Sequence, residues 1–265
     1  MKKFELTTES KINVFGKKLF RIKALISFGD VEEGETGGWI EKEENLEQSS
    51  SNAWVYGNAC VYGNACVSGN ARVSGNACVS DNACVSDNAR VSGNAWVSGN
   101  AWVSGNACVY GNARVSGNAC VSGNACVSGN ARVSGDAWVS SNACVYGNAR
   151  VSGDAWVSSN ACVYGNACVY GNACVSGDAW VSGDAWVSDN ADYTTIHGFG
   201  TQFRTTTFFR CKDNQIRVSC GCFFGTIPKF REQVKNTRNG KIAEEYLMIA
   251  DLMEKHFAEE KESGE

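Results

Sequence analysis

Residues 131 to 148 read ARVSGDAWVSSNACVYGN, and residues 149 to 166 repeat these eighteen letters without a change. Both copies are built from one six-residue word, Asn/Asp-Ala-x-Val-Ser/Tyr-Gly, in which x varies. The word continues from Asn52 to Asp192 and places twenty-four alanines at a spacing of six. A short fixed period means that each unit buries its apolar residues only against its neighbours, so the sequence predicts a solenoid.

The alternation within the word indicates which side chains face inward. In an extended strand, Ala and Val share one face and x takes the other. Position x is Cys eleven times, Trp seven times, Arg five times and Asp once, and such a set cannot pack inside a core one side chain wide. We therefore expect Ala and Val to point inward and x to point to solvent. Gly and Asn form the corners, because both tolerate left-handed backbone conformations.

The duplicated block indicates how many words make one coil. A duplication inside a solenoid is tolerated only if it adds a whole coil, so a triangular coil of eighteen residues is favoured over a two-sided coil of twelve. Twenty-four words then make eight coils, and with strands about 4.8 Å apart the rod is roughly 38 Å long. This register predicts three columns: Cys108, Cys126, Cys144 and Cys162; Arg114, Arg132 and Arg150; Trp138 and Trp156.

The word Val-Ser-Gly-Asn-Ala-x resembles the hexapeptide repeat of left-handed parallel β-helices. The stretches Lys18-Leu-Phe-Arg-Ile-Lys-Ala-Leu and Gly37-Gly-Trp-Ile-Glu-Lys-Glu-Glu-Asn-Leu are similar to the head of YdcK-like hexapeptide-repeat proteins of bacteria and phages. Thr205-Thr-Thr-Phe-Phe-Arg and Val218-Ser-Cys-Gly-Cys-Phe-Phe-Gly-Thr are similar to the ending of that family. The left-handed sense is implied by the resemblance, because ordinary parallel crossovers are right-handed. The resemblance implies a fold and a lineage but no reaction and no catalytic residue.

Two flanks frame the repeat, which gives three expected segments: 1–50, 51–193 and 194–265. A bare solenoid end exposes unpaired strand backbone, so we expect both flanks to be caps. In the first flank, Trp39 and Ile40 are placed to plug the first coil. Short strands are expected there at residues 4–6, 12–15 and 19–24.

The C-terminal flank is expected to be a hairpin followed by two helices. Two β-prone runs, 205–211 and 215–223, surround a turn at 212–214. Thr226 is a suitable N-cap for a helix with an apolar stripe, and Gly240 lies just beyond the expected end of that helix. A second amphipathic helix is expected over residues 241–257.

Composition excludes several classes of protein. The net charge is −4 and no segment carries a strong excess of either sign, so we do not expect a nucleic-acid partner. Neither an export signal nor a long apolar run occurs, so we expect a cytoplasmic protein without a membrane partner. Eleven of the fourteen cysteines occupy position x, and we interpret them as reduced surface thiols.

Enzymatic activity has little support in the residues. Many left-handed β-helix proteins are acyltransferases that use a histidine base near loops protruding between coils, but no loop interrupts this repeat. The only histidines are His197, after the last word, and His256, near the end of the chain. Cys220 and Cys222 could suggest a metal pair, but the hairpin register places Cys211 away from them. We therefore expect no catalytic residue, no cofactor and no metal.

The outward aromatic residues are the remaining functional signal. Seven Trp occupy position x and six Tyr replace Ser in the word, and Trp, Tyr and Arg dominate binding hot spots. We therefore expect a rigid, non-enzymatic scaffold for an unknown protein partner, with a phage origin as one interpretation. The candidate interaction surface comprises Trp96, Trp102, Arg114, Arg132, Trp138, Tyr146, Arg150, Trp156 and Tyr164.

Three alternatives stay open. The first is an acyltransferase-like enzyme with a site near His197, where the tail meets the last coil. The second is self-assembly into a filament or a trimer. The third is that position x simply tolerates any residue compatible with a flat, solvated strand.

Overall fold

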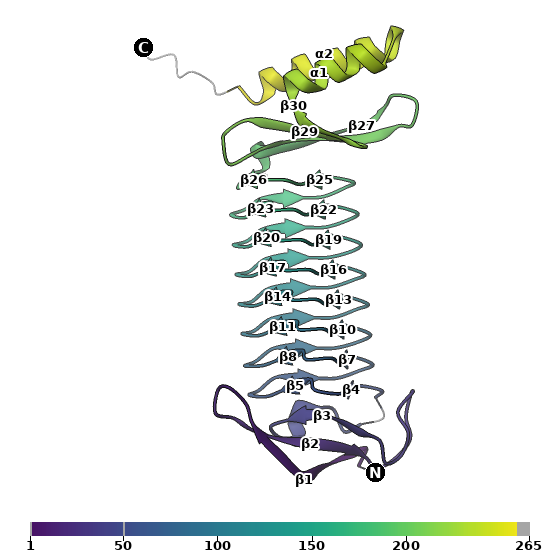
Figure 1. Ribbon diagram of the computed structural model, residues 1–265, viewed down its shortest axis with the longest axis vertical. Coiled ribbons are helices and arrows are strands. Elements are labelled where there is room, and N and C mark those ends of the chain that lie inside the picture. Colours follow the sequence, from purple (N-terminus) through teal and green to yellow (C-terminus); the bar gives the residue numbers. More distant parts are fainter. Residues whose placement is uncertain (1, 50, 259–265) are drawn as a thin grey trace.

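The computed structural model describes residues 2–49 and 51–258, which form a prism with an additional layer at each end (Figure 1). Between the flanks, twenty-three two-residue strands, β4 to β26, stack as parallel sheets. Strands pair with the strand eighteen residues away, so Cys120 lies beside Trp138 and Val121 beside Val139. The predicted β-solenoid of about eight triangular eighteen-residue coils is confirmed.

The three sheets of the prism are named here by the residues at position x near their middle. The arginine face contains β5 (Cys60–Val61), β8 (Cys78–Val79), β11 (Trp96–Val97), β14 (Arg114–Val115), β17 (Arg132–Val133), β20 (Arg150–Val151), β23 (Cys168–Val169) and β26 (Trp186–Val187). The tryptophan face contains β6 (Cys66–Val67), β9 (Cys84–Val85), β12 (Trp102–Val103), β15 (Cys120–Val121), β18 (Trp138–Val139), β21 (Trp156–Val157) and β24 (Cys174–Val175). The cysteine face contains β4 (Trp54–Val55), β7 (Arg72–Val73), β10 (Arg90–Val91), β13 (Cys108–Val109), β16 (Cys126–Val127), β19 (Cys144–Val145), β22 (Cys162–Val163) and β25 (Trp180–Val181).

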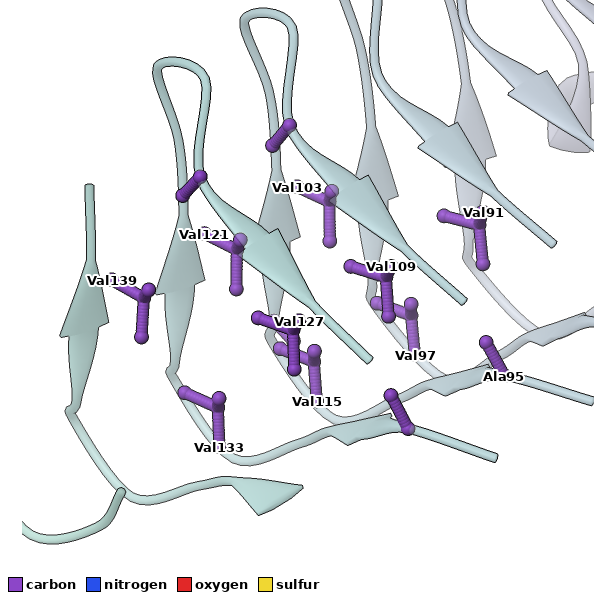
Figure 2. Close-up of a cluster of buried hydrophobic side chains, with 14 of the residues drawn as sticks. Val91, Ala95, Val97, Val103, Val109, Val115, Val121, Val127, Val133 and Val139 are labelled. Atoms are coloured by element: carbon purple, nitrogen blue, oxygen red, sulfur yellow. The ribbon is translucent and has the colours of Figure 1, made fainter. Parts of the chain in front are cut away.

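The interior of the prism consists of the alanine and valine side chains of the repeat. The alanines from Ala53 to Ala185 and the valines from Val55 to Val187 are at most 1% exposed. Figure 2 shows Val97, Val115 and Val133 at equivalent positions in successive coils. The predicted inward orientation of Ala and Val is therefore confirmed.

Each corner is a tight turn that lets the chain enter the next face. At one of them, Ala125 donates its N–H to the carbonyl of Ser122 at 3.3 Å, and Gly123 between them has a φ of +67°. A positive φ at the first central position, with Asn in the second, is typical of a type II′ turn and favours glycine. Where the word lacks this glycine, Asp81, Asp87, Ser141 and Ser159 adopt φ between 56° and 60°.

Asparagine side chains at the corners form ladders that run along the prism. The amide of Asn88 donates to the amide oxygen of Asn106 at 3.0 Å, and Asn106 donates in the same way to Asn124. Each bond joins residues eighteen apart and runs from an N-terminal coil to the next coil. The columns on the other two corners contain the same bonds, such as the 2.9 Å bond from Asn100 to Asn118.

The N-terminal flank extends the arginine face and closes the first coil. Its strands β1 (Phe4–Ile12), β2 (Lys18–Ala24) and β3 (Thr36–Ile40) pair antiparallel, and β3 then pairs parallel with β5. Ile40 is fully buried and faces the core, whereas Trp39 lies opposite Cys60 on the outer side of the sheet. After the short helix η1 (Glu43–Asn45), Leu46 bridges Val67 and begins the tryptophan face. Ile40 therefore has the plugging role predicted for it, and Trp39 does not.

One expected strand of this flank is wrong. Residues 12–15 lie at a turn, because the carbonyl of Asn13 accepts from the N–H of Gly16 at 3.0 Å. Only Ile12 belongs to a strand, as the last residue of β1. The tip of this β1–β2 hairpin reaches over the arginine face, where the ring of Phe15 stacks on Tyr62 with 6.2 Å between ring centroids.

The C-terminal flank is a four-stranded antiparallel sheet with two helices on its far side (Figure 1). After η2 (Asn190–Asp192), its elements are β27 (Tyr193–Phe199), β28 (Arg204–Arg210), β29 (Ile216–Cys220), β30 (Phe223–Thr226), α1 (Ile227–Thr237) and α2 (Gly240–His256). Thr226 caps α1 as predicted, since its hydroxyl accepts from the N–H of Lys229. The expected run 215–223 is instead two strands, because Gly221 adopts a φ of +59° and turns the chain. Gly240, which was expected just beyond the end of the first helix, is the first residue of α2.

The last coil is closed by groups from this flank. The backbone N–H of Trp180 donates to the Thr207 hydroxyl at 3.0 Å, and that of Cys174 donates to the Asn190 side chain at 2.8 Å. Phe209 is fully buried and continues the core of the prism. These contacts satisfy strand edges that would otherwise pair with another chain. Among the described residues, no helix is both long and apolar enough to span a membrane.

The opposite orientations of adjacent residues within β15 give a direct test of the fold. Changing Val121 to Ala removes two buried methyl groups, and we expect it to lower the free energy of unfolding by about 2 kcal/mol. The control, Cys120→Ala, alters an outward side chain and should change the free energy of unfolding by less than about 0.5 kcal/mol. Urea unfolding followed by circular dichroism measures both, and equal effects would contradict the inward packing of the valine.

Candidate functional site

The nine predicted surface residues lie on all three faces of the prism, so the structure divides them into three groups. Trp96 and the three arginines occupy the arginine face. Trp102, Trp138 and Trp156 occupy the tryptophan face, whereas Tyr146 and Tyr164 follow strands of the cysteine face. A single flat partner therefore cannot contact all nine residues at once.

The tryptophan face displays three large, exposed apolar side chains in one column. Trp102, Trp138 and Trp156 are 54%, 49% and 46% exposed. Trp138 and Trp156 are neighbours in the column, with ring centroids 5.6 Å apart. The indole N–H of Trp156 donates to the hydroxyl of Ser140 on the preceding coil at 3.3 Å, which fixes the orientation of the ring. Ser140 therefore supports the indole of Trp156, a role that the sequence pattern alone did not indicate.

The arginine face presents cations in register. Arg114, Arg132 and Arg150 are stacked on consecutive coils, as predicted, and all three are exposed. The guanidinium of Arg114 lies 6.0 Å from the ring centroid of Trp96. Within the described residues, the ion pairs of the chain do not include these three arginines. Their charges are therefore available to carboxylates of a partner.

The arginine and tryptophan faces meet at an edge that carries carboxylates. Each of Arg132 and Arg150 is followed six residues later by Trp138 or Trp156 on the adjoining face. The corner residues between them are Asp136 and Asp154, in place of the usual Asn. The two corners belong to the two copies of the duplicated eighteen-residue block, so the same Arg-Asp-Trp group occurs on two successive coils. It combines two of the residue types that dominate binding hot spots, Arg and Trp.

The cysteine face combines thiols with stacked tyrosines. Cys108, Cys126, Cys144 and Cys162 pair in register, which confirms the predicted column. The rings of Tyr146 and Tyr164 lie nearly parallel, at 5° and 5.1 Å between centroids. Tyr164 in turn meets Trp180 edge to face at 6.2 Å. The aromatic strip therefore leads along the face toward the C-terminal flank.

Not every residue at x or in the tyrosine slot is on the surface. Trp54 is fully buried, with Phe28 packed edge to face against its ring at 5.4 Å. Cys60 and Tyr62 are 8% and 7% exposed, because the β1–β2 hairpin covers the start of the arginine face. The expectation that all repeat cysteines and aromatic residues face solvent is therefore wrong at the first coil. The cover comes from a segment outside the repeat, which the period cannot predict.

Beneath this hairpin, one thiol has an unusual environment. Cys60 lies beside Cys78 in the strand register, and the ammonium of Lys11 lies close by. A hydrogen bond from the Cys78 thiol, aided by Lys11, lowers the pKa of Cys60 to about 6, although burial acts in the opposite direction. The pKa of Cys78 is raised, because its proton is held between the two sulfurs. Of the two thiols, Cys60 is therefore the one that ionises first.

A cleft of about 420 Å³ lies where the C-terminal flank meets the last coil of the cysteine face. Trp180, His197, Phe203 and Arg204 contribute to its lining. The Nδ1 atom of His197 lies 3.1 Å from the hydroxyl of Thr205, which holds the imidazole against β28. His256, the second histidine, is on α2 and is not part of this cleft.

The C-terminal cysteines do not form the pair that their spacing suggested. Cys220 ends β29, whereas Cys222 lies in the turn before β30 and is exposed. Cys211 donates its N–H to the carbonyl of Gln215 at 3.0 Å, so the predicted hairpin register is confirmed. Within residues 2–49 and 51–258, no three His, Cys, Asp or Glu side chains form a group that could hold a metal ion.

Three parallel sheets, a constant coil of eighteen residues and closed ends define the class of this chain as a β-solenoid repeat protein. A family model described as the YdcK Beta solenoid repeat matches seven stretches, each beginning at an alanine of the repeat: residues 65–81, 83–99, 89–105, 107–123, 125–141, 143–159 and 167–183. The chain is a YdcK-like β-solenoid repeat protein. No curated protein matches it.

The environment of Cys60 predicts a titration that one variant should remove. Because its pKa lies near 6, the thiolate absorbance of the folded protein should rise between about pH 5 and 7, below the ordinary thiol range near 8.5. This step should be absent in Cys60→Ser and should move toward 8.5 in Cys78→Ala, which removes the hydrogen-bond donor. Cys66→Ser is the control, because burial raises the pKa of Cys66. A step that survives in Cys60→Ser would contradict the assignment.

Proposed function

We propose that the chain is a rigid, non-enzymatic scaffold that binds a protein partner across the edge between the arginine and tryptophan faces. The observation that carries this proposal is the duplicated group of Arg132, Asp136 and Trp138 and its copy one coil further along. A regular core fixes the positions of these side chains, so little conformational entropy is lost when a partner binds.

The chemistry of this edge defines the partner it suits. Half-exposed indoles offer apolar area to a partner's aliphatic or aromatic side chains, and the arginines offer bidentate contacts to its carboxylates. A protein segment that places acidic residues beside apolar ones meets both requirements. Because the charge on the whole chain is only −4, recognition of this kind depends on the local pattern and not on long-range attraction.

The scaffold interpretation also agrees with the ends of the prism. Both flanks act as caps in this proposal, because side chains of the C-terminal flank satisfy the backbone of the last coil and β3 continues the first. End-to-end polymerisation needs open strand edges, which such contacts remove. The lateral faces are then the surfaces available for binding.

Replacing Trp138, Trp156, Arg132 and Arg150 by Ser should abolish capture of the partner, because hot-spot residues each contribute about 2 kcal/mol or more to binding. We expect quantitative affinity purification from the native cell to show at least a tenfold loss of one protein, confirmed with the purified partner. The matched control is Tyr146→Ser/Tyr164→Ser on the cysteine face, which should retain it. Equal retention by the two variants would sink the proposal.

A second candidate function, an acyltransferase-like enzyme, is favoured by one observation, the cleft beside His197. If the scaffold proposal holds, calorimetry with acetyl-CoA should give no binding heat. Measurable binding that Trp180→Ala or His197→Ala removes would favour the enzyme instead, because both residues line the cleft. The variant Trp138→Ala, on a different face, serves as the control.

A further inference from the structure

The column of four cysteines on the cysteine face is a feature that the docking proposal does not use. Cys108, Cys126, Cys144 and Cys162 stand on four consecutive coils, and each pairs in register with the next. All four are partly exposed free thiols. They lie on a different face from the arginine and tryptophan groups, so the two proposals can fail separately.

The spacing of this column suits a bridging metal ion better than a disulfide. Parallel strands are about 4.8 Å apart, whereas a relaxed disulfide needs Cβ atoms about 3.8 Å apart. With the zinc–thiolate bond length of about 2.3 Å as a guide, two such bonds in a straight line span roughly 4.6 Å, close to the strand spacing. The column therefore repeats, at every coil, a backbone spacing close to the sulfur separation that linear two-coordinate binding requires.

Three of the four thiols make weak contacts with backbone carbonyls of their own coil: Cys108 with Asn106 at 3.7 Å, Cys144 with Asn142 at 3.7 Å and Cys162 with Asn160 at 3.9 Å. The thiols of Cys144 and Cys162 are close enough for each to perturb the pKa of the other. The thiol of Cys126 points to the hydroxyl of Tyr110, 3.6 Å away, on the coil that carries Cys108. Because a thiol is a weak hydrogen-bond donor, each of these contacts can be exchanged for a metal–sulfur bond to an ion between two coils.

The ligand set indicates which ions the column selects. Zinc prefers four ligands, and among the described residues no three His, Cys, Asp or Glu side chains are placed to hold one metal ion together. Thiolates select soft ions, and Cu(I) and Ag(I) accept two sulfur ligands in a line. Hard ions such as Mg²⁺ and Ca²⁺ need several oxygen ligands, which this column of sulfurs does not provide.

We infer that the cysteine column is a binding site for soft univalent d¹⁰ cations, with each ion joining thiolates of two consecutive coils. Binding converts two thiols and one cation into a bis-thiolate complex of charge −1 and releases two protons. No electron is transferred. Burial raises the pKa of Cys108 and Cys144, and that of Cys162 to about 11, so affinity should increase with pH.

Cu(I) supplied anaerobically as its coloured bicinchoninate complex is the probe, and the loss of colour counts the ions that the reduced protein withdraws. Two double variants remove the same number of thiols but leave different geometry. Cys108→Ser/Cys126→Ser keeps the adjacent pair 144–162, whereas Cys126→Ser/Cys144→Ser leaves two thiols three coils apart. We expect the second variant to withdraw at least one ion fewer than the first.

Isolated cysteines of the repeat provide the control. Cys120 stands between Trp102 and Trp138, and Cys168 stands between Arg150 and Trp186. Cys120→Ser/Cys168→Ser should withdraw as many ions as the unchanged protein, and circular dichroism should show that all variants fold. Equal loss in the two column variants would mean that thiol number and not adjacency governs binding, which overturns the inference. So would unchanged uptake by Cys126→Ser/Cys144→Ser.

Discussion

The structure depends on one constraint, the backbone register that joins each coil to the next. In β15, the N–H of Cys120 donates to the carbonyl of Ala137 at 2.9 Å, and that of Ser122 donates to Val139 at the same distance. The pattern recurs from coil to coil, so any residue is stacked on the residue eighteen positions later. A change in coil length at one point would shift every column beyond it, which is why no insertion interrupts the repeat. Inward packing, corner ladders and outward columns all follow from this register.

The register also explains how much could be predicted. Alanine and valine positions, the three outward columns and the corner turns repeat with the sequence, so the inward and outward residues of the middle coils follow from counting. The flanks lack such a period. Burial of Cys60, and the position of Lys11 beside it, depend on how the β1–β2 hairpin folds back over the prism, whereas Trp54 is covered by Phe4 of β1 and by Phe28, which follows β2. Such contacts between distant segments leave no local signal in the sequence.

The candidate site likewise has features that follow from the repeat and features that do not. Columns of Arg, Trp and Cys were predictable because their members are eighteen residues apart. For the cleft beside His197, the sequence indicated only the place, where the tail meets the last coil, and not the residues that line it. The cleft requires β28 and the end of β29 to lie against the last coil, and the β-prone run 215–223 hid the turn at Gly221 that separates β29 from β30. Because the coil is triangular, the nine surface residues lie on three faces. The single surface expected from the sequence is therefore three separate surfaces.

The corner ladders connect this architecture to the proposed binding edge. Each ladder amide accepts from the coil before it and donates to the coil after it, so Asp can replace Asn only as an acceptor. Asp178 and Asp184 stand at the last rung of their columns, where each accepts from the preceding Asn and no further donation is required. Asp136 accepts from Asn118 at 2.7 Å but cannot donate to Asp154 on the next coil. The ladder is therefore interrupted inside the prism at the edge between the arginine and tryptophan faces. Two carboxylates stand there in place of a stabilising amide pair, which is the pattern expected where local stability is given up for a surface that binds.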